Sequence, residues 1–85
     1  MPSISMFFGI IIYMYFDDHT PPHFHAQYQD FKALFDFDGE LIEGTMPRTQ
    51  MKLISAWAAI HKEELAANWK LAQDKQPLYR IEPLR

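Results

Sequence analysis

The chain has 85 residues, a formal net charge of −3 and no cysteine, and 48% of its residues are hydrophobic. This length predicts one domain over residues 1–85 with a single core, and the hydrophobic content excludes a disordered chain. The absence of cysteine excludes disulfides and thiolate zinc sites and fits a cytoplasmic protein. The negative charge disfavours extensive binding to nucleic-acid phosphates, although it leaves a local contact open.

An apolar run from Met6 to Phe16 comes first in the chain. It is too short to cross a bilayer, which takes about 20 residues, and no Lys or Arg precedes it as in a signal peptide. Its β-branched and aromatic residues favour a strand that is buried on both faces. We therefore expect a soluble protein, not a membrane protein, with a first strand from about Phe8 to Phe16.

The segments that follow are predicted to form strands separated by turns. Pro21 and Pro22 interrupt the pattern after the first strand, since neither can donate to a β-ladder. Asp38-Gly39 is a strong signal for a two-residue hairpin turn. The three further strands expected are about His23–Tyr28, Phe31–Phe37 and Glu40–Thr45.

The rest of the chain is mostly helical in pattern. Apolar residues recur every three or four positions from Arg48 to about Lys75, and we expect a bend or break near His61. The tail is predicted to add a short edge strand around Tyr79 to Ile81. The fold class is α+β: a small antiparallel meander of three to four strands packed under one long or two shorter C-terminal helices. Its inner face should carry Phe24, Tyr28, Phe35 and Phe37.

Three of the four histidines lie between Asp17 and Tyr28, in the stretch "DDHTPPHFHAQY". Strand alternation would place His23 and His25 on one face, away from the core, with His19 entering from the loop. Two imidazoles, a third from a neighbouring loop and nearby carboxylates suit a divalent ion such as zinc or nickel. The candidate metal ligands are His19, His23, His25, Asp17 and Asp18.

Two other interpretations of this cluster stay open. Without a metal, His19, His23 and His25 are candidate catalytic residues for acid–base chemistry or substrate binding, because imidazole titrates near neutral pH. The cluster also fits a purely structural role, in which the two prolines fix the strand register and His19 caps the turn. His61, on the helical stripe, is interpreted as a boundary or packing residue.

Several segments together resemble one bacterial family. The motifs "DHTPPHFH", "HKEELAANW" and "IEPL" are similar to those of domain of unknown function 4160, along essentially the whole chain. The resemblance implies a small stand-alone bacterial protein without an established activity. It also implies a gene that often lies beside one for domain of unknown function 2442, an arrangement similar to toxin–antitoxin pairs.

Two classes of function follow. The first is one component of a two-gene toxin–antitoxin-like module that acts through protein–protein interaction, as a homo-oligomer or with the small protein encoded by the adjacent gene. The alternative is a hydrolase or nuclease built on the histidine cluster, with or without a metal ion. Whether the protein is an enzyme is left open by the sequence.

Overall fold

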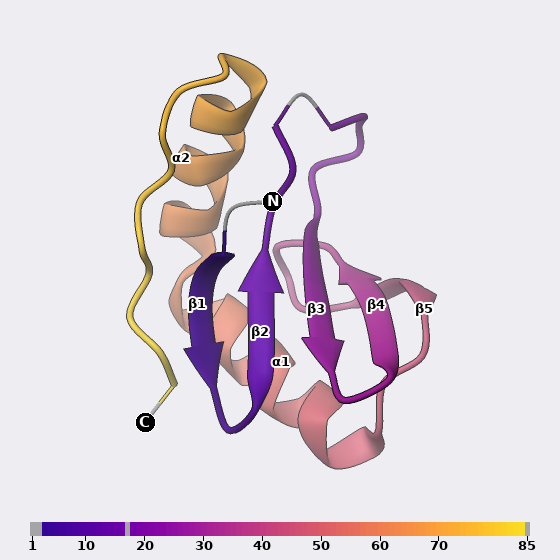
Figure 1. Cartoon of the computed structure of the whole chain (residues 1–85). Helices are drawn as coiled ribbons and strands as arrows, with labels where there is room; N and C mark the ends of the chain where they lie inside the picture. Colours follow the sequence, from indigo (N-terminus) through magenta and orange to yellow (C-terminus); the bar gives the residue numbers. More distant parts are fainter. Residues whose placement is uncertain (1–2, 17, 85) are drawn as a thin grey trace.

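The computed structural model describes residues 3–16 and 18–84. Five strands form one antiparallel sheet in chain order, and two helices follow them. Helix α1 crosses behind the sheet, α2 rises above the start of β1, and the C-terminal tail descends beside β1 (Figure 1). The elements are β1 (Ser3–Phe7), β2 (Ile10–Tyr13), β3 (Phe24–Tyr28), β4 (Phe31–Phe35), β5 (Leu41–Gly44), α1 (Arg48–Ile60) and α2 (Lys62–Gln73). The predicted α+β meander under C-terminal helices is confirmed, with five strands instead of three or four.

The additional strand comes from a turn inside the N-terminal apolar run. The predicted strand from Phe8 to Phe16 is wrong at both ends, because Phe8 and Gly9 form a two-residue turn and β2 stops at Tyr13. Phe8 and Gly9 have φ values of 48° and 78°. Positive φ at both positions gives a turn whose twist matches that of the flanking strands. Glycine adopts this conformation easily and phenylalanine rarely does. Of the two turn positions, only Gly9 therefore carries a residue that signals the turn in the sequence.

The connection between β4 and β5 is longer than the predicted Asp38-Gly39 turn. It runs from Asp36 to Glu40, and Oδ1 of Asp36 accepts hydrogen bonds from the backbone N–H groups of Asp38 at 2.9 Å and Glu40 at 3.0 Å. Gly39 has a φ of 85°, and a Cβ there would lie 2.8 Å from the Cα of Ser55 on α1. The aspartate therefore organises the loop, and the glycine lets it lie directly on the helix.

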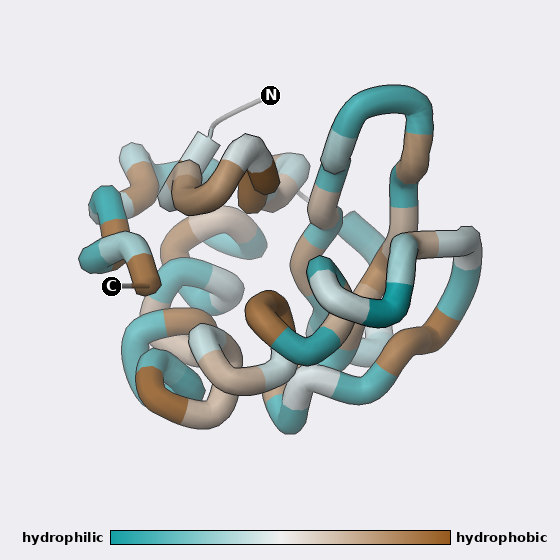
Figure 2. The backbone as a smooth tube through the Cα atoms, turned by 90° about the horizontal axis from the view of Figure 1, so that it is seen from below, coloured by the Kyte–Doolittle hydropathy of each residue, from teal (hydrophilic) through white to brown (hydrophobic). Residues whose placement is uncertain are grey.

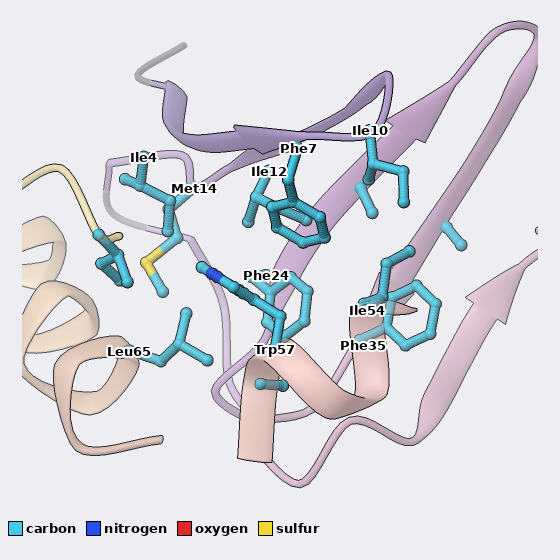
Figure 3. Close-up of a cluster of buried hydrophobic side chains, with 14 of the residues drawn as sticks. Ile4, Phe7, Ile10, Ile12, Met14, Phe24, Phe35, Ile54, Trp57 and Leu65 are labelled. Carbon is cyan, nitrogen blue, oxygen red and sulfur yellow. The ribbon is translucent and has the colours of Figure 1, made fainter. Parts of the chain in front are cut away.

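The core fills the space between the sheet and α1. Trp57 is completely buried, and its ring lies 5.4 Å from that of Phe7 and 5.7 Å from that of Phe24 (Figure 3). Its indole N–H donates to the carbonyl of Glu82 at 2.8 Å, so burial leaves no unpaired donor. The predicted inner face is confirmed for Phe24 and Phe35, which are buried, and for Tyr28, which is partly buried against the core. Phe37 lies in the turn after β4 and packs on the core from there.

The predicted helix break occurs at His61. This residue has a non-helical φ of −111° between α1 and α2, and its N–H still donates to the carbonyl of Trp57. Glu63 and Glu64 lie in the first turn of α2, where negative charge is favourable. His61 is thus a boundary residue, as expected, and its Nδ1 lies 2.6 Å from Oε1 of Glu64.

The C-terminal tail is extended but does not form the strand predicted at Tyr79–Ile81. Its link to the sheet is a hydrogen bond of 2.7 Å from the N–H of Ile81 to the carbonyl of Ile4. The buried side chain of Asn68 pairs with both backbone groups of Tyr79, at 3.0 Å and 2.9 Å. The tail is therefore held by side chains of the helices more than by strand pairing.

Hydrophilic and hydrophobic residues alternate in short segments along the backbone (Figure 2). This distribution gives the elements an apolar side for the core and a polar side for water. In the described ranges, neither helix has the length and apolar character needed to span a bilayer.

Candidate metal centre

The histidine cluster lies where the connection from β2 to β3 returns to the sheet. In Figure 1 this connection rises above the strands, near the C-terminal end of α2. Gln73, the last residue of α2, donates from Nε2 to the carbonyl oxygen of Asp18 at 2.8 Å. The loop that carries Asp18 is thereby attached to the helix.

Two imidazoles converge on one carboxylate oxygen. Oδ2 of Asp18 lies 2.9 Å from Nε2 of His23 and 3.1 Å from Nε2 of His25. The three potential ligand atoms all lie within 4.8 Å of one another. Metal–ligand bonds of about 2.0–2.2 Å bring neighbouring ligand atoms to roughly 3 Å apart. The cluster therefore has the size of a coordination sphere.

The second nitrogen of His23 determines how the ring is oriented. Nδ1 lies 2.7 Å from the carbonyl oxygen of Pro21, which only accepts hydrogen bonds, so Nδ1 carries a proton. In a neutral His23 the remaining lone pair is then on Nε2 and points at Oδ2 of Asp18. Two lone pairs can face each other at this distance only if a proton or a cation lies between them. An imidazole whose outer N–H is bonded to a backbone carbonyl is the usual arrangement of a metal-binding histidine.

Aromatic rings enclose the two histidines. The His25 ring is stacked on Tyr13, with centroids 5.1 Å apart, and meets Tyr15 edge-on at 4.6 Å. The His23 ring lies 5.4 Å from Trp69 of α2. These neighbours hold both rings in place and keep much of the surrounding water out.

The predicted exposure of His23 is wrong. We expected it to project with His25 away from the core, but its side chain is only 3% exposed and packs on Trp69. The two rings do lie on the same side, with centroids 5.1 Å apart, but Trp69 of α2 covers His23 there. His25 does lie in β3, with its side chain 14% exposed.

The carboxyl group of Asp18 is held in its ionised form. Burial by itself would raise the pKa of Asp18, but hydrogen bonds from His25 and from the backbone N–H of His19, together with His23, lower it below the ordinary 3.8. The cluster thus presents a carboxylate at neutral pH, which is the form that binds a cation.

His19, another of the predicted ligands, does not join this group. The His19 side chain is 85% exposed, and its Nδ1 lies 3.2 Å from Oδ1 of Asp18, the oxygen that the other histidines do not contact. Asp17 lies outside the described residues. The structure therefore brings together Asp18, His23 and His25, with His19 beside them.

Four supporting residues were not identified from the sequence: Tyr13, Tyr15, Trp69 and Gln73. The register Tyr13↔His25 between β2 and β3 puts these two rings side by side, and strand alternation would have suggested it had the end of β2 been known. Burial and the neighbouring Tyr15 raise the pKa of Tyr13, so its hydroxyl stays protonated. For Gln73 the sequence carries no signal, because its contact depends on where α2 ends.

Comparison with known proteins gives one match. A family model described as "Domain of unknown function (DUF4160)" matches residues 9–70, a range that contains the whole cluster. Searches of curated proteins and of solved structures gave no match.

Proposed function

The chain belongs to the family described as a domain of unknown function (DUF4160), and we propose that it binds a divalent metal ion through Asp18, His23 and His25. The observation that carries this proposal is the convergence of two Nε2 atoms on one carboxylate oxygen, with the outer nitrogen of His23 fixed by a backbone carbonyl. A cation between these atoms satisfies the carboxylate and both nitrogen lone pairs at once.

The ligand types indicate which ions suit the site. Two imidazoles and one carboxylate form a set that binds zinc, and also iron or nickel, whereas magnesium and calcium prefer oxygen alone. An ion in such a set acidifies a bound water and polarises carbonyl or phosphoryl oxygens. The reaction class that this chemistry serves is hydrolysis of an ester or phosphodiester.

Metal titration of chelator-treated protein tests the proposal. Wild-type protein should take up one equivalent of zinc, measured by mass spectrometry after dialysis and by competition with a chromophoric chelator. Asp18→Asn, His23→Asn and His25→Ala should each weaken binding by more than the roughly 10- to 100-fold that loss of an outer-sphere partner costs. His23→Asn is chosen because its amide can still donate to the carbonyl of Pro21 while no atom replaces Nε2.

His61→Ala is the matched control. His61 is also next to a carboxylate, that of Glu64, but it lies at the helix break outside the cluster. This variant should bind zinc as the wild type does. Wild-type protein that takes up no metal, or three cluster variants that bind as tightly as the wild type, would contradict the proposal.

A second candidate is the binding of a partner protein within a cytoplasmic two-gene module similar to toxin–antitoxin pairs. It is supported by apolar side chains at the surface, among them Leu41 at 41% and Ile42 at 46% exposure on the edge strand β5. Co-expression with the product of the adjacent gene should then give a complex that survives size-exclusion chromatography. Separate elution of the two proteins would count against this candidate.

A further inference from the structure

The proposed metal centre has three possible protein ligands among the described residues. Resting on that proposed function, we infer that the centre is open: Asp18, His23 and His25 are its protein ligands, and the remaining position takes a water or an anionic oxygen ligand. That ligand is a phosphate or carboxylate group, which enters from the side of His19.

The number of protein ligands indicates an open centre. In the described parts of the chain, the residues able to hold an ion here are Asp18, His23 and His25. Structural zinc sites normally use four protein ligands, whereas catalytic zinc sites use three and keep the fourth position for water or substrate. The three ligands present among the described residues match the second kind.

The obvious fourth ligand in the sequence, His19, lies apart from the other two histidines. Its ring is 85% exposed, and its Nδ1 lies against Oδ1 of Asp18, not in the group around Oδ2. Its backbone N–H donates to the same Oδ1 at 3.0 Å. The backbone N–H of His19, which does not depend on the side chain, therefore orients the carboxylate so that Oδ2 faces the two imidazoles, while the exposed ring stays outside the group.

The surroundings show on which side the centre is accessible. Trp69 lies next to His23, and Tyr13 and Tyr15 lie next to His25. Tyr15 is itself 42% exposed, and on the loop side residues 19–22 are all exposed. The incoming ligand thus reaches the ion past the loop, where His19 is the exposed side chain beside Asp18.

Charge indicates the kind of ligand. A divalent cation held by one carboxylate and two neutral imidazoles leaves the loaded centre with a net positive charge. The side chains of Asp18 and His25 are only 13% and 14% exposed, so solvent screens this charge less than at an open surface. An anionic oxygen at the free position neutralises it, which favours phosphate and carboxylate groups over neutral ligands.

Cobalt spectroscopy tests this inference without relying on activity. Co²⁺ is loaded into chelator-treated protein, and inorganic phosphate is then added while equilibrium dialysis checks that cobalt stays bound. At an open site, phosphate should change the position or intensity of the visible d–d bands. The spectral change should correspond to one phosphate bound per cobalt ion. Sodium acetate, tested in parallel, separates a preference for phosphate from a response to any oxygen anion.

The variant His19→Ala separates an open from a closed centre. We expect it to bind one equivalent of cobalt and to give the wild-type spectrum before phosphate is added. A changed spectrum or lost cobalt in this variant would make His19 a ligand and overturn the inference. A cobalt-loaded wild type whose spectrum ignores both anions would also overturn it and leave metal binding intact, whereas absence of cobalt binding would overturn both proposals.

Discussion

At the scale of single residues, His23 has two roles: it is a proposed metal ligand, and it stabilises the fold. Its Nδ1 donates to Pro21, its Nε2 faces Asp18, and its ring is buried on Trp69. Truncating the ring therefore removes packing and leaves the Pro21 carbonyl without its donor, and both changes are independent of a metal.

We predict that His23→Ala lowers the free energy of unfolding of the metal-free protein by about 1–3 kcal/mol. His23→Asn, which keeps a hydrogen-bond donor near the carbonyl of Pro21, should lower the free energy of unfolding by less. Urea unfolding in the presence of a chelator, followed by tryptophan fluorescence, measures both values. Equal losses in the two variants would show that the hydrogen bond to Pro21 contributes nothing.

Asp18 leads to a prediction about pH. Its pKa in the folded chain is below the ordinary 3.8, so its ionised form stabilises the fold above that pH, and this contribution disappears as pH falls through the folded pKa. In metal-free protein, wild type should therefore melt at a higher temperature than Asp18→Asn near neutral pH. The difference should shrink in acid, whereas a pH-independent difference would contradict the assigned role of the carboxylate.

The cluster itself was predictable because its members lie close together in the sequence. Of the five candidate ligands that the sequence named in this stretch, Asp18, His23 and His25 come together in the structure. The burial of His23 could not be predicted, since it depends on Trp69, which the fold of α2 brings over the loop. The separation of His19 from the other two histidines depends on the loop conformation. The two prolines restrict the backbone angles of this loop but do not determine its path.

At the scale of elements, the C-terminal tail depends on one buried side chain. Asn68 of α2 is fully buried and its amide satisfies both backbone groups of Tyr79. The tail in turn reaches the sheet through Ile81 and covers Trp57 through the carbonyl of Glu82. A change at Asn68 should therefore act on the tail as a whole.

We predict that Asn68→Ala destabilises the protein by about 2–4 kcal/mol, because two hydrogen bonds are lost and a cavity is left. Trypsin should also cleave the variant faster after Arg80. Lys70→Ala, an exposed change on the same helix, is the control and should leave both readouts unchanged. If the Asn68→Ala variant resisted trypsin as well as the wild type does, the tail would be held by its other contacts.

The helices and the central strands were easier to predict than the N-terminal strands. The helical periodicity extends over many residues, and a helix break at His61 is marked by the acidic residues after it. The hairpin at Phe8-Gly9, by contrast, lies inside an uninterrupted apolar run, where buried strands and their turns look alike. Its single glycine was the only available signal, and the neighbouring phenylalanine obscured it.

At the scale of the whole molecule, the two edges of the sheet differ. The tail lies along β1 and bonds to it through Ile81 and Ile4, whereas all four residues of β5 are exposed, with Ile42 at 46%. An unprotected edge strand with apolar side chains is a site for pairing with another chain. We propose on this basis that the protein forms a homodimer through β5, or a tight complex in which a small partner occupies the same edge.

Light scattering coupled to size-exclusion chromatography tests this last prediction. Ile42→Lys places a charge on the open edge and should convert the assembly to monomers, because a buried lysine would oppose strand pairing. Ile60→Lys, at a position 66% exposed at the end of α1, adds the same charge elsewhere and should leave the assembly intact. Both variants should keep the metal affinity of the wild type, since neither position belongs to the cluster. A wild type that is monomeric at high concentration and binds no product of the adjacent gene would refute the prediction, and equal disruption by both variants would move the interface away from β5.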